Sequence, residues 1–134
     1  MKKSDKRADI LQAALELIAE NGFHDAPMSE IAAKAGVAAG TIYRYFPSKD
    51  DLIVSVYRTL EDMLIEAILE ESVGGRSLRE RFLALQRASI KYFVAHPLHF
   101  RFMEQFFNSP YGDTMRRDSL LGQPGKNSLL IDIF

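Results

Sequence analysis

Apolar residues recur at intervals of three and four along most of the chain, which is the spacing of helices that bury one face. No stretch alternates apolar and polar residues as a half-buried strand does, so the pattern predicts an all-α fold. The first helix is expected over about residues 5–21, with Ser4 as its N-cap and Gly22 as its stop. Its buried stripe is predicted to contain Ile10, Leu11, Ala14, Leu15 and Ile18.

Two short helices are predicted next, with a glycine between them. The first covers about residues 29–35 and ends at Gly36, and the second covers about residues 38–46. The second helix stops before Pro47, because the residue that precedes a proline is pushed out of the helical region. Helices this short are not stable alone, so both must pack against a neighbour.

The second half of the chain predicts a long helix followed by shorter ones. Ser48 and Asp51 form a start like a capping box, and an apolar stripe then continues for about five turns. Further helices are expected over about residues 78–96 and 98–108. Over residues 109–127, Ser, Pro, Gly and Asp accumulate without periodicity, which predicts a long loop.

The last residues, 128–134, are rich in apolar side chains, as the beginning of another helix would be. A terminus in solvent should not tolerate this density, so a further segment is expected to cover it. We therefore expect the 134 residues to be part of a longer protein. The alternative is a complete small protein whose last turn packs into its own core.

Composition and charge narrow the class of protein. The absence of cysteine excludes disulfides and thiolate metal sites. Residues 1–9 lack the apolar segment of a signal peptide, and no apolar run approaches the ~20 residues that span a bilayer, so a cytoplasmic protein is expected. The net charge of −1 argues against a protein that coats nucleic acid by bulk charge. Any DNA binding must therefore be local.

A helix followed by two short helices around a glycine turn is the outline of a helix-turn-helix unit. A more specific signal is the stretch 28–49, which reads MSEIAAKAGVAAGTIYRYFPSK. This stretch closely resembles the DNA-binding domain of the tetracycline-repressor (TetR) family, and the resemblance covers about residues 6–58. It implies a three-helix DNA-binding domain over residues 1–47. Residues 48–134 would then hold the connecting helix and an incomplete helical domain for ligand binding and dimerisation.

The second short helix carries side chains that suit contact with DNA. Small residues at its start allow a close approach of the backbone, while tyrosine, arginine and lysine suit phosphate oxygens or base edges. The predicted DNA-binding residues are Ser29, Ala38, Ala39, Gly40, Thr41, Tyr43, Arg44, Tyr45 and Lys49. By the resemblance, the positions that hold the DNA backbone are Tyr43, Tyr45 and Lys49. The positions near the bases are Gly40, Thr41 and Arg44.

Two observations limit this interpretation. Tyr43 and Tyr45 have an alternative role, which is packing against the first helix. The sequence also has Ala26-Pro27 and Ala38 where the family often places Ser or Thr. A capping hydroxyl worth ~1 kcal/mol is therefore missing at each short helix, together with a potential phosphate contact. The departure weakens the expected anchoring to DNA and leaves the predicted fold unchanged.

Aromatic residues gather between residues 77 and 108. Most of them are expected in the core, but the resemblance implies that some line an apolar ligand pocket between helices. The residues predicted for this pocket are Phe102, Met103 and Phe106. His96 and His99 are interpreted as helix-end residues, because no cysteine or carboxylate array accompanies them to bind zinc.

The resemblance implies a homodimeric, ligand-responsive transcriptional regulator, most simply a repressor of a palindromic double-stranded DNA operator. Its partners would be the operator, a second copy and an unknown small-molecule effector, without a membrane. No cofactor or metal is predicted. Two alternative classes are a helical adaptor that binds another protein through its aromatic surface, and an enzyme. The sequence contains no nucleophile elbow, phosphate loop or HExxH motif to give an enzyme its catalytic groups, so none is expected.

Overall fold

The computed structural model describes residues 5–71 and 77–120, and every regular element in this part of the chain is an α-helix. The prediction of an all-α fold is confirmed. No helix within the described ranges is both long and apolar enough to cross a membrane. The elements are α1 (Lys6–Asn21), α2 (Met28–Ala35), α3 (Ala39–Tyr45), α4 (Lys49–Glu71), α5 (Leu78–Ala95), α6 (Pro97–Phe107) and α7 (Pro110–Leu120).

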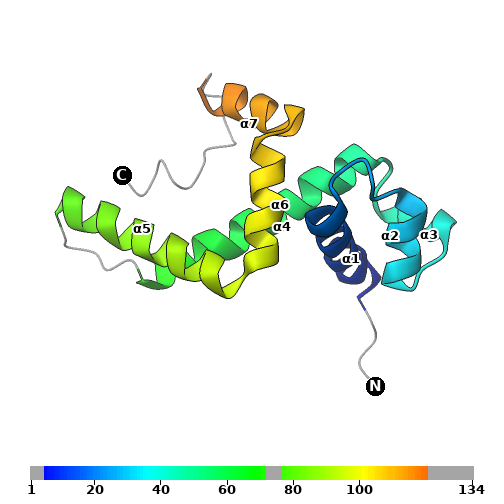
Figure 1. Cartoon of the computed structure of the whole chain (residues 1–134), viewed down its shortest axis with the longest axis horizontal. Coiled ribbons are helices and arrows are strands. Elements are labelled where there is room, and N and C mark those ends of the chain that lie inside the picture. Colours follow the sequence, from blue (N-terminus) through cyan, green and yellow to red (C-terminus); the bar gives the residue numbers. More distant parts are fainter. Residues whose placement is uncertain (1–4, 72–76, 121–134) are drawn as a thin grey trace.

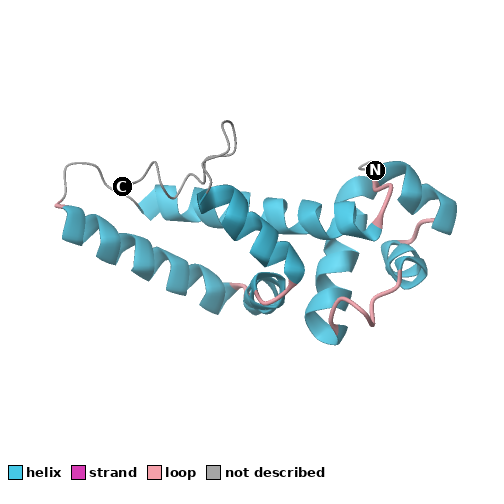
Figure 2. Cartoon of the chain, turned by 90° about the horizontal axis from the view of Figure 1, so that it is seen from above, coloured by secondary structure: helices cyan, strands magenta, loops and turns pink. Residues whose placement is uncertain are grey.

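Helix α4 forms the long axis of the molecule (Figure 1). Helices α1, α2 and α3 gather around its N-terminal end, and α5 returns antiparallel along its C-terminal half (Figures 1 and 2). Helix α6 crosses α4 and packs against α1 as well, and α7 turns off the end of α6. The N-terminal three-helix unit is therefore held by both α4 and α6.

The helix ends lie close to where the sequence predicts them, with one correction at the first cap. The N-cap of α1 is Asp5, whose carboxylate accepts a hydrogen bond from the Ala8 amide at 3.2 Å. Ser4, the expected cap, lies outside the described residues. Helix α1 ends at Gly22, which has a φ of 86°. At the start of α4, the Ser48 hydroxyl accepts from the Asp51 amide at 3.1 Å, as the capping pattern predicts.

The predicted loop over residues 109–127 is wrong for its first part, because α7 occupies residues 110–120. Tyr111 and Met115 pack against the hydrophobic core, which stabilises a helix that the sequence pattern does not indicate. Gly112 looks like a helix breaker in the sequence, but a Cβ there would lie 2.6 Å from the carbonyl oxygen of Phe107. Glycine therefore permits the close approach of α7 to α6. Residues 121–134, including the apolar 128–134 stretch, lie outside the described residues.

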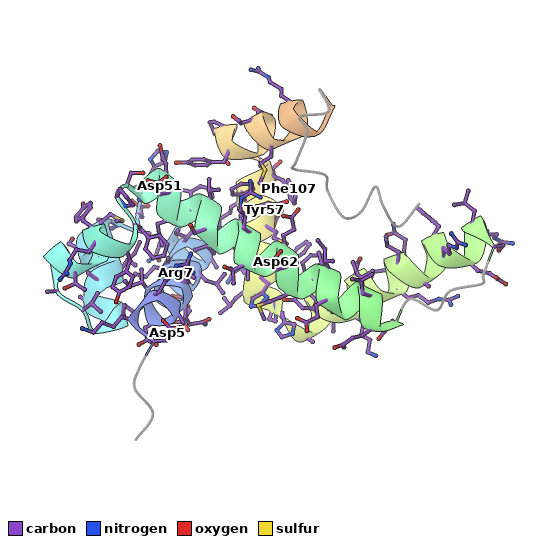
Figure 3. The ribbon with its side chains drawn as sticks, turned by 180° about the vertical axis from the view of Figure 1, so that it is seen from behind. Asp5, Arg7, Asp51, Tyr57, Asp62 and Phe107 are labelled. Carbon is purple, nitrogen blue, oxygen red and sulfur yellow. The ribbon has the colours of Figure 1, made fainter. Side chains whose placement is uncertain are left out.

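One hydrophobic core joins the N-terminal unit to α4 and α6. Phe102 and Phe106 of α6 are fully buried in it together with residues of α1 and α4. The Tyr57 ring of α4 stacks on Phe106 with ring centroids 4.2 Å apart, and Phe107 meets Tyr57 edge-on at 5.7 Å (Figure 3). A displacement of α6 must therefore be felt by the N-terminal unit, because their side chains share one closely packed interior.

Candidate nucleic-acid interface

The turn between α2 and α3 is set by a glycine and an apolar interior. Gly36 takes the left-handed conformation with a φ of 74°, which ends α2, and its amide donates to the Ala32 and Ala33 carbonyls. Ile31 of α2 and Ile42 of α3 are fully buried in the core. Burial of these residues turns the other face of α3 toward solvent.

The exposed face of α3 contains most of the residues that the sequence predicts for DNA binding. Ala38, Ala39, Gly40 and Arg44 are exposed, and Thr41 is half-buried. A Cβ at Gly40 would have no atom within 4 Å, so the start of α3 is open to an approaching backbone. The polar and aromatic side chains of this face come from the middle and end of α3, and they are Thr41, Tyr43, Arg44 and Tyr45.

The two tyrosines of α3 are exposed and do not belong to the core. Tyr43 is 51% exposed and Tyr45 is 42% exposed. Each ring thus leaves about half of its surface open to a partner, and Tyr45 lies beside Lys6 of α1 in a groove described below. Exposed tyrosine hydroxyls are suitable donors to phosphate oxygens.

Lys6 is a residue of this face that the sequence prediction omitted. It comes from the first turn of α1 and lines a groove of about 310 Å³ together with Thr41, Arg44 and Tyr45 of α3. All four side chains are polar and two are cationic, so the groove suits an anion. The only sequence signal was the basic character of residues 2–7.

Arg7, the neighbour of Lys6, is directed elsewhere. Its guanidinium carbon lies 5.2 Å from the centroid of the Phe46 ring, in a cation–π contact. Figure 3 shows Arg7 on α1. This contact helps to hold the end of α3 against α1 and thereby positions the groove.

Lys49 and Ser29 do not line the α3 groove. Ser29 is exposed at the start of α2. Lys49 is half-buried at the start of α4, and its ammonium group donates a hydrogen bond to the carbonyl oxygen of Phe23 in the loop between α1 and α2. Lys49 and Arg44 therefore do not line one groove, and their common DNA interface stays a prediction.

A salt bridge fixes α2 on α1 beside this face. The Lys34 ammonium lies 3.2 Å from a carboxylate oxygen of Glu16. The hydrogen bond from Gln12, assisted by Lys34, holds the pKa of Glu16 below its ordinary value. The N-caps of α2 and α3 are Pro27 and Ala38, neither of which makes a side-chain capping bond, as the sequence departure predicts. Packing against the core therefore holds both short helices without side-chain caps, and the salt bridge adds a tie for α2 alone.

The comparison with protein families identifies this unit. Residues 10–56 match the family model for bacterial regulatory proteins of the tetR family. The N-terminal unit of this chain is therefore a DNA-binding domain of the TetR type. Its seven described helices superpose on a TetR-family transcription regulator from Shewanella sp. PV-4 with a TM-score of 0.78 and 32% sequence identity, covering 87% of this chain and 62% of that one.

Curated proteins of known sequence give the same assignment. The chain is 42% identical over 83 residues to the fatty acid metabolism regulator protein of Bacillus subtilis, a match that covers 62% of this chain and 42% of that protein. It is 39% identical over 67 residues to the transcriptional regulator BetI of Escherichia coli, covering 50% of this chain and 34% of BetI. The chain thus spans less than half the length of these TetR-family relatives.

The TetR-family ligand pocket was predicted to include Phe102, Met103 and Phe106. All three are buried in the core that joins α6 to the N-terminal unit. The largest cavity that we describe, about 650 Å³, is lined by other residues and lies at the junction of α4, α6 and α7. A ligand contact for the three core residues stays a prediction.

The two histidines lie at the corner between α5 and α6. Their rings stack with centroids 4.7 Å apart, and His99 Nδ1 shares a hydrogen bond of 2.7 Å with the Tyr92 hydroxyl. Burial, with His96 nearby, lowers the pKa of His99. Within the described residues no group of three or more His, Cys, Asp or Glu side chains is placed to hold a metal ion. The geometry fits the interpretation of both histidines as helix-end residues.

Proposed function

We propose that this protein is a TetR-family, sequence-specific DNA-binding transcriptional regulator that inserts α3 into the major groove. The observation that carries the proposal is the exposed face of α3, where Arg44 and Thr41 share a groove with Lys6. The open backbone at Gly40 allows this face to approach DNA closely. Arginine to guanine is the commonest specific contact in the major groove, so Arg44 is the proposed base reader.

The remaining contacts of the interface are proposed to hold phosphates. Tyr43 and Tyr45 extend from α3, Ser29 is exposed at the start of α2, and Lys6 extends the cationic surface onto α1. Phosphate contacts orient the protein on the duplex and give binding its salt dependence. We therefore expect the logarithm of affinity to fall with the logarithm of salt concentration, by about 0.9 per phosphate neutralised.

Two copies are proposed to bind a palindromic operator, with one α3 in each of two successive major grooves. Regulation is proposed to be repression through occlusion of the operator in the cytoplasm. An apolar or amphipathic small molecule bound among the helices after α4 would release the DNA. The name of the Bacillus subtilis relative refers to fatty acid metabolism, which makes acyl compounds the first effectors to try.

The test is selection of duplexes from a random-sequence pool by the whole protein. An enriched palindrome is the expected result, and an adaptor or an enzyme without DNA specificity would enrich nothing. Arg44→Ala should enrich a broader set of sequences, while Lys91→Ala is the matched control, because Lys91 lies on α5 and pairs with Glu71 at 2.6 Å. Absence of enrichment with the wild-type protein, or binding that is insensitive to salt, would refute the proposal.

The effector part of the proposal needs a separate measurement. A thermal-shift screen over acyl compounds and other amphipathic metabolites should find a compound that raises the melting temperature. The same compound should weaken binding of the selected duplex by ~1 to 3 kcal/mol, and the duplex should weaken binding of the compound by the same amount. If every stabilising compound left the DNA bound, the protein would be a regulator without this ligand response.

A further inference from the structure

A cavity of about 650 Å³ opens where the N-terminal unit meets α6 and α7, and we name it the junction cavity. Its volume lies within the range of roughly 300–1,000 Å³ that small-molecule sites occupy. It is distinct from the α3 groove, and it borders the core around Phe102 through Phe23 and Ile53. The junction cavity is lined by Phe23, His24, Lys49, Asp50, Ile53, Gln105, Asn108, Ser109, Pro110 and Tyr111.

The walls of the junction cavity combine aromatic rings with an apolar floor. The rings of Phe23 and Tyr111 are both half-buried, with centroids 5.7 Å apart and planes inclined by 59°. Ile53, which is 1% exposed, closes the site from α4. Gln105 contributes an amide that also donates to the Ala19 carbonyl at 3.2 Å, so α6 is tied to α1 beside the cavity. The two contacting rings form one wall, against which a flat apolar group can lie.

The two charged side chains that line the junction cavity, Asp50 and Lys49, have different hydrogen-bond partners. The Asp50 carboxylate is exposed and accepts a hydrogen bond from the Tyr111 hydroxyl. Lys49 is half-buried, and its ammonium donates to the neutral carbonyl of Phe23. It is a member of neither the Lys34–Glu16 nor the Lys91–Glu71 salt bridge. A cation in a concave site without a carboxylate partner favours an anionic ligand, because charge-assisted hydrogen bonds are about twice as strong as neutral ones.

We propose that the junction cavity binds a planar aromatic carboxylate, whose carboxylate accepts from Lys49 and whose ring lies against Phe23 and Tyr111. Such a ligand would compete with other acceptors, such as the Phe23 carbonyl oxygen, for the Lys49 ammonium group. The sequence predicts that Lys49 also holds a DNA phosphate. On that prediction, which rests on the proposed DNA-binding function, ligand and DNA oppose each other through this one residue. The site would act at the base of the DNA-binding unit, separately from a pocket among the later helices.

The direct test measures binding of 2-naphthoate to the whole protein by fluorescence titration in the absence of DNA. Saturable binding is expected, with 2-naphthylmethylammonium binding at least tenfold more weakly because its charge is reversed. Lys49→Gln should weaken 2-naphthoate binding by about tenfold or more, and Lys49→Arg should retain most of it. Lys91→Gln is the matched control and should bind as the wild type does.

A second variant keeps the test valid if Lys49→Gln disturbs the fold, which circular dichroism will report. His24 is exposed at the mouth of the cavity, so His24→Trp should fill the space and abolish binding without loss of helix content. Chemical-shift changes on adding 2-naphthoate should centre on the amides of residues 23, 24, 108, 109 and 111. Equal binding of the ammonium compound, unchanged binding by both variants, or shifts confined elsewhere would overturn the proposal. Because no DNA is present, failure here leaves the proposed regulator function standing.

Discussion

Arg44 and Lys49 are cations with different surroundings, and their substitution should have different effects. Arg44 lines the α3 groove, whereas Lys49 donates to the Phe23 carbonyl at the start of α4. Arg44→Ala is expected to reduce discrimination between the selected duplex and single-base variants by ~1 to 3 kcal/mol. Lys49→Ala should weaken binding to all DNA sequences alike. It should also reduce the magnitude of the slope of log affinity against log salt concentration by about one. Titration of several duplexes at several salt concentrations measures both effects. If Arg44→Ala instead weakened binding to every duplex equally, Arg44 would contact a phosphate and not a base.

Tyr111 provides a prediction about stability and pH. Burial, and then the hydrogen bond to Asp50 and the charge of Asp50, raise the pKa of Tyr111 from 10.0 to about 12. A raised pKa means that folding favours the neutral phenol, so its stabilising effect is complete below pH 10 and disappears as the pH rises toward 12. Tyr111→Phe should lower the free energy of unfolding by about 0.5 to 1.5 kcal/mol at pH 8.

The difference between wild type and Tyr111→Phe should shrink as the pH rises from 10 toward 12. Urea unfolding followed by circular dichroism at pH 8 and pH 11 measures it. Tyr45→Phe is the control, since Tyr45 is an exposed tyrosine on α3. A difference that grew with pH would contradict the assigned direction of the pKa shift.

At the scale of elements, two helical glycines should respond oppositely to the same substitution. Gly40 in α3 has open space around a Cβ, so Gly40→Ala should stabilise the protein by about 0.5 to 1 kcal/mol through helix propensity. Gly112 in α7 would place a Cβ 2.6 Å from the Phe107 carbonyl oxygen. Gly112→Ala should therefore destabilise by about 1 to 3 kcal/mol, because the overlap outweighs propensity.

Thermal and urea unfolding of the two alanine variants make this comparison. Proteolysis near α7 adds a local measurement, since Gly112→Ala should expose residues 110–120 to cleavage earlier than the wild type does. Stabilisation by Gly112→Ala would mean that α7 does not pack against α6 in solution as it does in the structure.

At the scale of the whole molecule, the shared core predicts that α6 supports the DNA-binding unit. Phe102 is fully buried and meets Phe23 edge-on, with ring centroids 6.0 Å apart. Phe102→Ala should cost ~3 to 5 kcal/mol, a large part of the stability of a typical domain. Phe100→Ala is the matched control, because the Phe100 ring on the same helix is 49% exposed.

Urea unfolding should report both values, and DNA binding at elevated temperature should be lost first in Phe102→Ala. The alternative role of Phe102, as a wall of a ligand pocket, predicts the reverse pattern. In that case Phe102→Ala would change ligand release of DNA and leave the free energy of unfolding close to that of the wild type.

The sequence by itself determined the helical fold and the first six helices, because the signals that set them act within a few residues. Gly36 ends α2, the residue before Pro47 ends α3, and Ser48 caps α4 without help from distant parts of the chain. The stretch 28–49, which contains several of these local signals, resembles a TetR-family DNA-binding domain, and the family model matches residues 10–56.

Only the tertiary structure decided which distant residues share a site. Lys6 and Arg44 line one groove because α1 packs on α2 and α2 packs on α3. Lys49 donates to Phe23 because that loop lies beside the start of α4. Helix α7 exists where the local pattern predicts a loop, since Tyr111 packs on a core built from earlier helices. These outcomes depend on contacts between residues far apart in the chain. Helix propensity and apolar periodicity describe only neighbouring residues, so they do not predict such contacts.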